Sequence, residues 1–273
     1  MNCFEKFLYL LQKEMETPVS YGWYHFIWII LVILILILLY KLKDKYNEKQ
    51  LKFILGIYSI TALILETLKQ LIWSFNYDSV TNIITWNYEW YSFPFQLCTT
   101  PIYVCLICFF LKNKKIRKYL LSYIAYITIL GSLATIIYPE SCFTSDILVN
   151  IHTMWLHCGS LVVSIYLIMT NEVELSIKNL IKSIVVFIIF IIIAQALNIT
   201  IYNLNILNGE TFNMFYISPY FISSLPIFDI IQKALPYPLF LLVYITILTL
   251  GSVIIYYLGL IIKIMFKKAR TNI

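Results

Sequence analysis

Long apolar runs separated by short polar stretches form the dominant pattern along the chain. Several of these runs exceed the roughly 18 residues that a helix needs to cross a bilayer. The pattern predicts an all-α, polytopic membrane protein with seven transmembrane helices in a single transmembrane domain, residues 1–273. A transmembrane β-barrel would show short segments of alternating hydrophobicity instead. The predicted spans are residues 24–41, 53–75, 93–111, 119–138, 148–169, 180–203 and 238–262.

The segments outside these spans differ in character. Residues 1–22 carry several charges and no long apolar core, so we expect the first span, and not a cleaved signal peptide, to direct insertion. Within them, residues 3–12 are mildly amphipathic, which is typical of a helix lying on the membrane surface, with a disordered tail as an equal alternative. Residues 204–236 contain several prolines and are expected to form an outer-side loop.

Basic residues set the predicted orientation, because cytoplasmic loops carry an excess of Lys and Arg. Sixteen of the 20 Lys and Arg residues lie in the connections that follow the first, third, fifth and seventh spans. The opposite side holds Lys6, Lys13 and Lys233, and Lys69 lies within the second span. The asymmetry therefore predicts an N-terminus outside and a C-terminus in the cytoplasm.

Composition supports the membrane assignment. Hydrophobic residues make up 61% of the chain and charged residues only 12%, whereas soluble domains have roughly a quarter charged residues. The net charge of +6 is concentrated in short loops, so it reflects membrane topology and we expect no nucleic-acid partner. Heavy use of Ile, Lys and Asn is typical of an AT-rich bacterial genome, which predicts the plasma membrane as the location.

Polar residues inside the predicted spans fall at a similar depth. Ionisable groups within a span are costly and usually face the bundle interior. Nearly all of them lie in the outer half, whereas the inner half is almost purely apolar. This one-sided clustering predicts a polar cavity that opens toward the outer leaflet or the outside water. The candidate site residues are His25, Glu66, Lys69, Gln96, Cys98, His152, His157, Asn198 and Asp229.

Each candidate also has a simpler structural interpretation. Glu66 and Lys69 are three residues apart, so they can pair on one helix face and merely join helices. A free Cys such as Cys98 is often just a small buried hydrophobe. His152 and His157 are five residues apart, about 140° around a helix, which does not form the one-face pair of a zinc site. We therefore expect no metal and no cofactor, since the spacing does not require a heme or soft-metal site.

The six cysteines include no CxxC pair. Cys3 and Cys142 fall on the same predicted side of the membrane. Their positions permit a disulfide, but sequence alone does not establish one.

Short motifs along nearly the whole chain carry a resemblance to a known family. The most distinctive is YSFPFQLC, which runs from Tyr91 to Cys98 at the start of the third predicted span. The chain resembles the bacterial YwaF-type integral membrane proteins, in which the corresponding helix carries an LPLQLC motif. The further matches are Tyr24-His25, Glu66, Ile102-Tyr103-Val104-Cys105, His152 with His157 and Gly159, Asn198, Asn213-Met214-Phe215, Asp229 and Pro236-Tyr237-Pro238.

That family is similar, more distantly, to eukaryotic transmembrane acyltransferases of ether phospholipids and to androgen-induced-gene-type hydrolases of fatty-acid esters. A Cys is the acyl-accepting nucleophile in the first group and a Thr in the second, with a His as partner in both. The resemblance therefore implies Cys98 as nucleophile and His157 as base. The chain departs from the family pattern at the looser segment around Asp229, at Cys158 and at Lys69.

Three functional hypotheses follow. The first is a lipid acyltransferase or acyl-ester hydrolase in which Cys98 and His157 act on a lipid of the outer leaflet. The second is a transporter or small-molecule receptor that uses the same cavity, although the apolar inner half offers no path for transport. The third is a non-catalytic membrane scaffold. Membrane lipids are the expected substrate or ligand. In the first hypothesis, His152, Glu66 or Asp229 orients the base. Asn198 or Gln96 stabilises the oxyanion, and His25 and Lys69 support the site.

Overall fold

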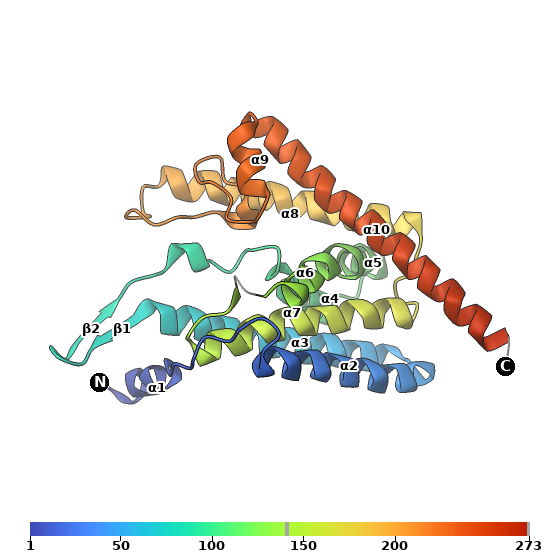
Figure 1. Cartoon of the computed structure of the whole chain (residues 1–273), viewed down its shortest axis with the longest axis horizontal. Coiled ribbons are helices and arrows are strands. Elements are labelled where there is room, and N and C mark those ends of the chain that lie inside the picture. Colours follow the sequence, from blue (N-terminus) through green and yellow to red (C-terminus); the bar gives the residue numbers. More distant parts are fainter. Residues whose placement is uncertain (140–141, 272–273) are drawn as a thin grey trace.

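Among the residues that the structure describes, six helices are long and apolar enough to cross a membrane, by length and composition. The computed structural model describes residues 1–139 and 142–271, which are helical apart from loops and one short hairpin (Figure 1). The chain is therefore an all-helical membrane protein. The six helices are α2 (Trp23–Leu42), α3 (Glu48–Ser74), the continuous run of α5 (Lys114–Tyr123), η3 (Ile124–Thr128) and α6 (Ile129–Ile137), then α7 (Ile147–Met169), α8 (Ile177–Asn203) and α10 (Tyr237–Thr271).

The predicted third span, residues 93–111, is not one continuous helix. Only α4 (Thr100–Phe110) is helical, and its 11 residues are fewer than a spanning helix needs. Two prolines explain the break. Proline has no backbone N–H, so Pro101 is tolerated in the first turn of α4, whereas Pro94 would interrupt a helix interior. A run of apolar residues indicates burial but does not show that the backbone is helical.

Shorter elements surround the N-terminus. Helix α1 (Cys3–Leu11) begins with a capping box between Asn2 and Glu5 and packs Leu8 into a cluster with Phe75. Strands β1 (Phe75–Asp78) and β2 (Ile83–Trp86) form an antiparallel hairpin. The remaining elements are η1 (Lys43–Lys45) after α2, η2 (Trp90–Ser92) after the hairpin, and η5 (Met214–Tyr216) and α9 (Phe228–Ala234) between α8 and α10.

Helix α7 lies at the centre of the packing. It contacts α2, α3 and α6, and it is the most buried of the six long helices. Polar contacts join it to α6 and η3, because the Ser160 hydroxyl hydrogen-bonds that of Ser132 in α6 and Ser164 Oγ donates to the Ile124 carbonyl in η3 at 2.8 Å. Such hydroxyl contacts are common between membrane helices. Helix α2, by contrast, exposes much of its Ile and Leu surface, as a lipid-facing helix does.

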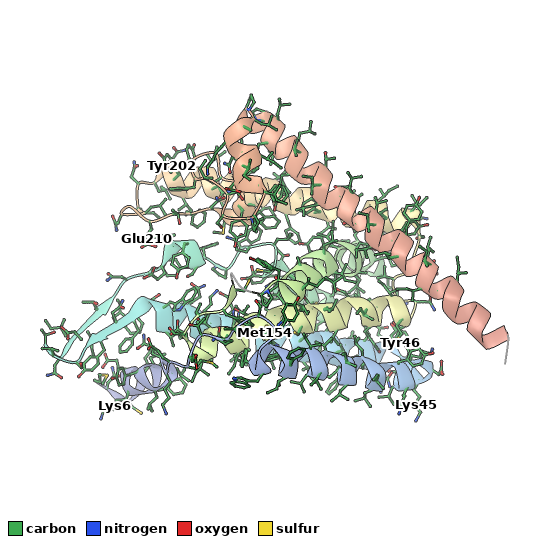
Figure 2. All side chains as sticks on the ribbon, in the orientation of Figure 1. Lys6, Lys45, Tyr46, Met154, Tyr202 and Glu210 are labelled. Carbon is green, nitrogen blue, oxygen red and sulfur yellow. The ribbon has the colours of Figure 1, made fainter. Side chains whose placement is uncertain are left out.

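The two ends of the chain lie at opposite ends of the bundle (Figure 1). One end carries α1, with Lys6, and the β1–β2 hairpin, and we refer to it as the hairpin end (Figures 1 and 2). The other carries Lys45 and Tyr46 and is called the basic end (Figure 2). Because α3 and α7 each run between these ends, a residue's place in either helix gives its depth.

Candidate functional site

The candidate nucleophile lies in an irregular segment, residues 93–99, that leads into α4. A local turn holds this segment, because Gln96 N donates to Thr99 Oγ1 at 2.8 Å and Thr99 Oγ1 donates back to the Gln96 carbonyl at 2.9 Å. Cys98 is part of that turn and keeps some accessible surface, whereas Cys105 and Cys108 within α4 are buried. Of these three cysteines, Cys98 thus lies at the entrance of the helix, and Cys105 and Cys108 are buried within it.

Glu66 is the centre of a buried charged cluster on α3 and α7. Its Oε1 lies 2.7 Å from Lys69 Nζ and accepts a hydrogen bond from Gln70 Nε2 at 2.8 Å. Its Oε2 lies 2.8 Å from His152 Nε2. Glu66 is eight residues from the end of α3 at the hairpin end, about 12 Å deep. The expected pair of Glu66 with Lys69 is therefore formed, and His152 of α7 joins it.

Burial makes this cluster costly to disturb. Glu66, Lys69 and His152 are all almost completely removed from solvent, at 2%, 7% and 4% exposure. A buried charge is tolerated when it is paired and hydrogen-bonded. Gln70 extends the network outward, because its Nε2 also donates to the Ser92 carbonyl at 2.6 Å. The cluster is thus tied to the loop that covers the hairpin end of α3.

Cys98 lies beside this cluster. Its sulfur is within electrostatic range of Lys69 and Glu66. Among the described residues, no hydrogen bond joins the Cys98 thiol to His157, and the His157 ring nitrogens have no hydrogen-bond partner. His157 is 7% exposed on α7. The two predicted catalytic groups therefore lie on two walls of the site, residues 93–99 and α7, and no hydrogen bond joins them in the described part of the chain.

Tyr58 of α3 contacts the α7 wall and lies within electrostatic range of the other. Its hydroxyl donates to the carbonyl of Leu156, next to His157, at 3.2 Å and is within electrostatic range of Cys98. The Tyr58 ring rests against Gly159, where an added Cβ would come within 2.7 Å of the ring. This close approach gives a physical reason for glycine two residues after His157. Glycine allows α3 and α7 to lie close enough for Tyr58 to reach both walls.

Two amides hold a strained loop against the site. Gln96 Nε2 donates to the Asn213 carbonyl at 3.0 Å, and Gln96 Oε1 accepts from Phe215 N at 2.8 Å. Asn198 binds both backbone groups of Met214, at 2.7 and 3.0 Å.

This loop has an unusual backbone. Phe215 and Tyr216 both have positive φ, at 58° and 59°, which non-glycine residues adopt rarely and at a cost. The same loop brings the Tyr216 side chain within electrostatic range of Cys98. Gln96 and Asn198 therefore act in this arrangement as supports of the loop, and each already donates one amide N–H.

Two loops at the hairpin end contact each other near the cluster. The carboxylate of Glu210 accepts a hydrogen bond from Trp90 N at 2.6 Å, and the ring of Trp90 packs against Phe212. Burial, followed by the negative charges of Glu66 and Glu210, raises the pKa of Tyr88 to about 12. Tyr88, which packs against Trp90, is thus within electrostatic range of the buried cluster.

Two predicted site residues make separate contacts. His25 is fully buried on α2, where its Nδ1 accepts from Tyr21 N at 3.0 Å and its ring packs against Phe143. Asp229 lies on α9 and pairs with Lys233 at 3.7 Å on a partly exposed surface. The structure therefore brings together Glu66, Lys69 and His152, with Cys98 beside them.

Three participants were not predicted: Tyr58, Tyr88 and Tyr216. The chain has 22 tyrosines, and no spacing distinguishes these three from the rest. Cys3 is an exposed free thiol, so the disulfide that the sequence permits with Cys142 is not formed. In the described part of the chain, no group of three or more His, Cys, Asp or Glu side chains converges as metal ligands would.

Comparison with known proteins gives one match. A family model of the TMEM164 family, a multi-pass membrane family, matches residues 20–256. The match includes every candidate site residue, from His25 to Asp229. No curated protein and no solved structure matches the chain.

Proposed function

The chain belongs to the TMEM164 family of multi-pass membrane proteins, and on that premise we propose that it is a lipid acyltransferase or acyl-ester hydrolase. Cys98 is the nucleophile and His157 the general base, as the YwaF-type resemblance implies. The observation that carries the proposal is the setting of Cys98: a partly buried cysteine at the entrance of α4, within electrostatic range of the buried charges of Lys69 and Glu66. Reactive cysteines typically lie at helix N-termini and next to cations, where the thiolate is favoured.

The reaction has two halves. In the first, His157 accepts the S–H proton of Cys98, and the thiolate attacks the carbonyl carbon of a lipid ester. The C–O bond breaks, the acyl group becomes a thioester on Cys98, and the proton passes from His157 to the departing oxygen. In the second, water or the hydroxyl of a lysolipid gives its proton to His157 and attacks the thioester. The thiolate then leaves and recovers the proton.

This mechanism requires a hydrogen bond between Cys98 and His157, which the described residues do not form. Catalytic hydrogen bonds are often loose before substrate binds and tighten in the complex. Tyr58 contacts α7 next to His157 and lies within electrostatic range of Cys98, so a shift of its ring can bring the two groups together. Lys69 supplies the positive charge that stabilises the thiolate, and Glu66 and His152 hold Lys69 in place.

The topology in this proposal has seven crossings, with the N-terminus outside and the C-terminus in the cytoplasm of a bacterial cell. Residues 93–99 and α4 together make the third crossing. The position of the two chain ends at opposite ends of the bundle supports an odd number of crossings (Figure 1). The excess of Lys and Arg beyond α2, α4, α7 and α10 supports the basic end as cytoplasmic. The plasma membrane is then the location, and the site faces the outer leaflet.

A receptor or transporter function has less support. In that hypothesis Glu66 and Lys69 would bind a zwitterion. They contact each other at 2.7 Å and also contact Gln70 and His152. A zwitterion would have to break this buried pair in order to bind.

The test uses purified protein in vesicles that contain phosphatidylcholine with an alkyne-tagged acyl chain. Samples quenched over time are analysed for the tag on the Cys98 peptide and for released tagged fatty acid or tagged new phospholipid. Wild type is expected to give a hydroxylamine-labile adduct on Cys98 and a tagged product. Cys98→Ser is expected to lose the labile adduct, and His157→Gln to lose product.

Matched controls separate chemistry from folding. Cys3→Ser changes an exposed cysteine on α1, and His25→Gln changes a buried histidine that contacts Tyr21 and Phe143. Both are expected to retain adduct and product. Neither adduct nor product in wild type would refute the enzyme proposal. Full activity in folded Cys98→Ser would refute the assignment of the nucleophile.

A further inference from the structure

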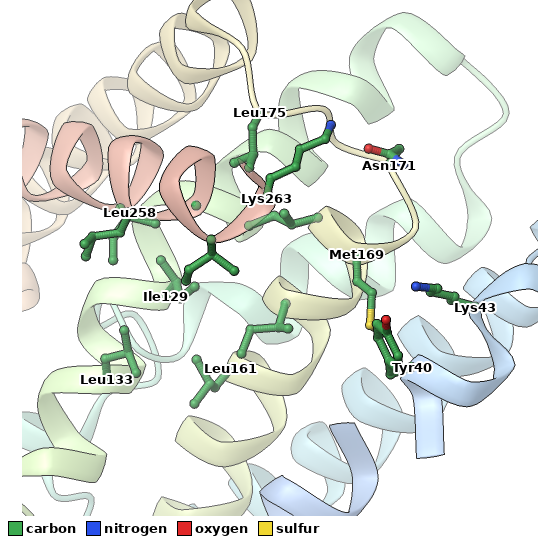
Figure 3. A pocket seen from close by; sticks show the side chains of 15 residues that line it. Tyr40, Lys43, Ile129, Leu133, Leu161, Met169, Asn171, Leu175, Leu258 and Lys263 are labelled. Atoms are coloured by element: carbon green, nitrogen blue, oxygen red, sulfur yellow. The ribbon is translucent and has the colours of Figure 1, made fainter. Parts of the chain in front are cut away.

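A cavity that does not include Cys98 lies toward the basic end of the bundle. This cavity of about 710 Å³ opens between α2, α6, α7 and α10 (Figure 3). This volume is within the range of pockets that hold small ligands. The proposed reaction uses none of the residues that line it, so this cavity needs its own explanation.

The cavity has an apolar body and a polar end. Leu133, Leu161 and Leu258 line the body, whereas Lys43, Asn171 and Lys263 line one end (Figure 3). On α7 the lining runs from Leu161 to Met169, which is about 12 Å of helix. An occupant therefore has an elongated apolar part and a polar head, and the head lies at the basic end.

The two lysines at the polar end have no carboxylate to neutralise them. Among the described residues, neither Lys43 nor Lys263 forms an ion pair. Lys43 Nζ instead lies 3.7 Å above the centre of the Tyr40 ring.

Two carboxylates of the basic end are already engaged. Glu48 pairs with Arg117 at 2.9 Å, and Glu172 accepts from the Tyr46 hydroxyl at 2.5 Å. Two unpaired amines and an amide at the mouth of an apolar cavity are complementary to one anionic head group.

We propose that this cavity binds an anionic phospholipid of the cytoplasmic leaflet. Its phosphate contacts Lys43 and Lys263, and Asn171 donates a further hydrogen bond. One acyl chain lies along α7 and α10 in the apolar body. Basic pockets between membrane helices at the cytoplasmic side are a known way of holding anionic lipid head groups. The site is distinct from Cys98, and its existence does not depend on acyl transfer.

The test is native mass spectrometry of the full chain in detergent, titrated separately with phosphatidylglycerol and phosphatidylcholine of the same acyl chains. Wild type is expected to retain phosphatidylglycerol preferentially. The Lys43→Gln/Lys263→Gln variant is expected to lose about tenfold in affinity for phosphatidylglycerol and little for phosphatidylcholine. Leu258→Trp, which narrows the apolar body without changing charge, is expected to weaken phosphatidylglycerol binding as well.

The matched control removes two other basic residues of the same end. Lys45→Gln/Lys115→Gln makes the same change in net charge at exposed positions that do not line the cavity. It is expected to bind phosphatidylglycerol as wild type does. Equal losses in the two double variants would indicate general surface charge and overturn the proposal. Equal retention of both lipids by wild type would also overturn it, because the cavity would then be an unselective crevice.

Discussion

Glu66 Oε2 and His152 Nε2 lie 2.8 Å apart across the interface between α3 and α7. The other oxygen of Glu66 lies 2.7 Å from Lys69 Nζ, so one buried carboxylate contacts two basic groups on two helices. Removing one member of a buried ionic group leaves the others without compensation, which is more costly than never burying them. This relationship makes the cluster both a structural joint and a fixed source of charge beside Cys98.

Glu66→Gln is expected to lower the free energy of unfolding by about 3–5 kcal/mol. The amide keeps the shape of the side chain but leaves the Lys69 ammonium buried without a counter-charge. Glu66→Gln combined with Lys69→Met is expected to recover most of that loss, because no charge is then stranded. Denaturant unfolding in detergent, followed by tryptophan fluorescence, measures both variants.

The matched control for this prediction is Asp229→Asn. Asp229 and Lys233 form a pair at 3.7 Å on a much more exposed surface, and such pairs contribute about 1 kcal/mol or less. If Glu66→Gln lowered the free energy of unfolding no more than Asp229→Asn does, water would have to reach the cluster and solvate the Lys69 ammonium.

Gly159→Ala is expected to destabilise the protein by about 1–3 kcal/mol through overpacking. The new methyl group would come within 2.7 Å of the Tyr58 ring, so Tyr58 must leave its place against α7. We also expect the variant to lose activity in the tagged-lipid assay, because Tyr58 joins the walls that carry Cys98 and His157.

Gly131→Ala is the comparison for this glycine. Gly131 lies within α6, and an added Cβ there meets nothing within 4 Å. Alanine is a better helix former than glycine by up to about 1 kcal/mol, so Gly131→Ala is expected to be neutral or stabilising. Equal effects of the two substitutions on thermal unfolding would contradict the packing argument at Gly159.

Much of this architecture could be predicted from the sequence, because a helix that crosses a bilayer requires a long apolar run. The run lengths predicted helices where α2, α3, α7 and α8 lie. They did not predict the break before α4, because hydrophobicity does not report backbone conformation. Pro94 was the available signal for that break, since proline disfavours a helix interior.

The candidate site was less predictable than the fold. The spacing of Glu66 and Lys69 predicted their pair, since residues three apart share a helix face. The spacing of His152 and His157 predicted only that they face different directions. Which of them meets Glu66 depends on the rotation of α7, and packing between distant residues, such as Tyr58 against Gly159, sets that rotation.

Gln96→Ala and Asn198→Ala are each expected to cost about 1–3 kcal/mol, because the first leaves the buried Phe215 N–H and the second the buried Met214 N–H without a partner. The two losses are expected to be non-additive by about 0.5–3 kcal/mol, since both side chains hold the same loop. A double-mutant cycle by denaturant unfolding measures the coupling. Hydrogen exchange is expected to rise at Met214 and Phe215 in both single variants. Strict additivity of the two free-energy losses in the cycle would instead mean that the two side chains support the loop independently.

Protonation of Glu89 is expected to tighten the contact between the two loops at the hairpin end that Trp90 and Glu210 join. Burial and the nearby charge of Glu210 raise the pKa of the Glu89 carboxyl above its ordinary value of 4.5. A carboxyl whose pKa is raised by folding contributes stability that is fully present below the unfolded pKa and is lost as pH rises through the folded pKa. Hydrogen exchange of residues 87–92 should therefore slow as pH falls through this window, after correction for the intrinsic pH dependence of exchange.

Glu89→Gln should show slow exchange of residues 87–92 at neutral pH and lose the pH dependence. Asp78→Asn at the hairpin tip is the control. Hydrogen bonds from Thr81 and Val80 lower the pKa of Asp78, so the stability that its carboxylate contributes is lost as pH falls, which is the opposite pH dependence. Faster exchange of residues 87–92 in Glu89→Gln at neutral pH would show that the Glu89 charge stabilises the loop contact instead of opposing it.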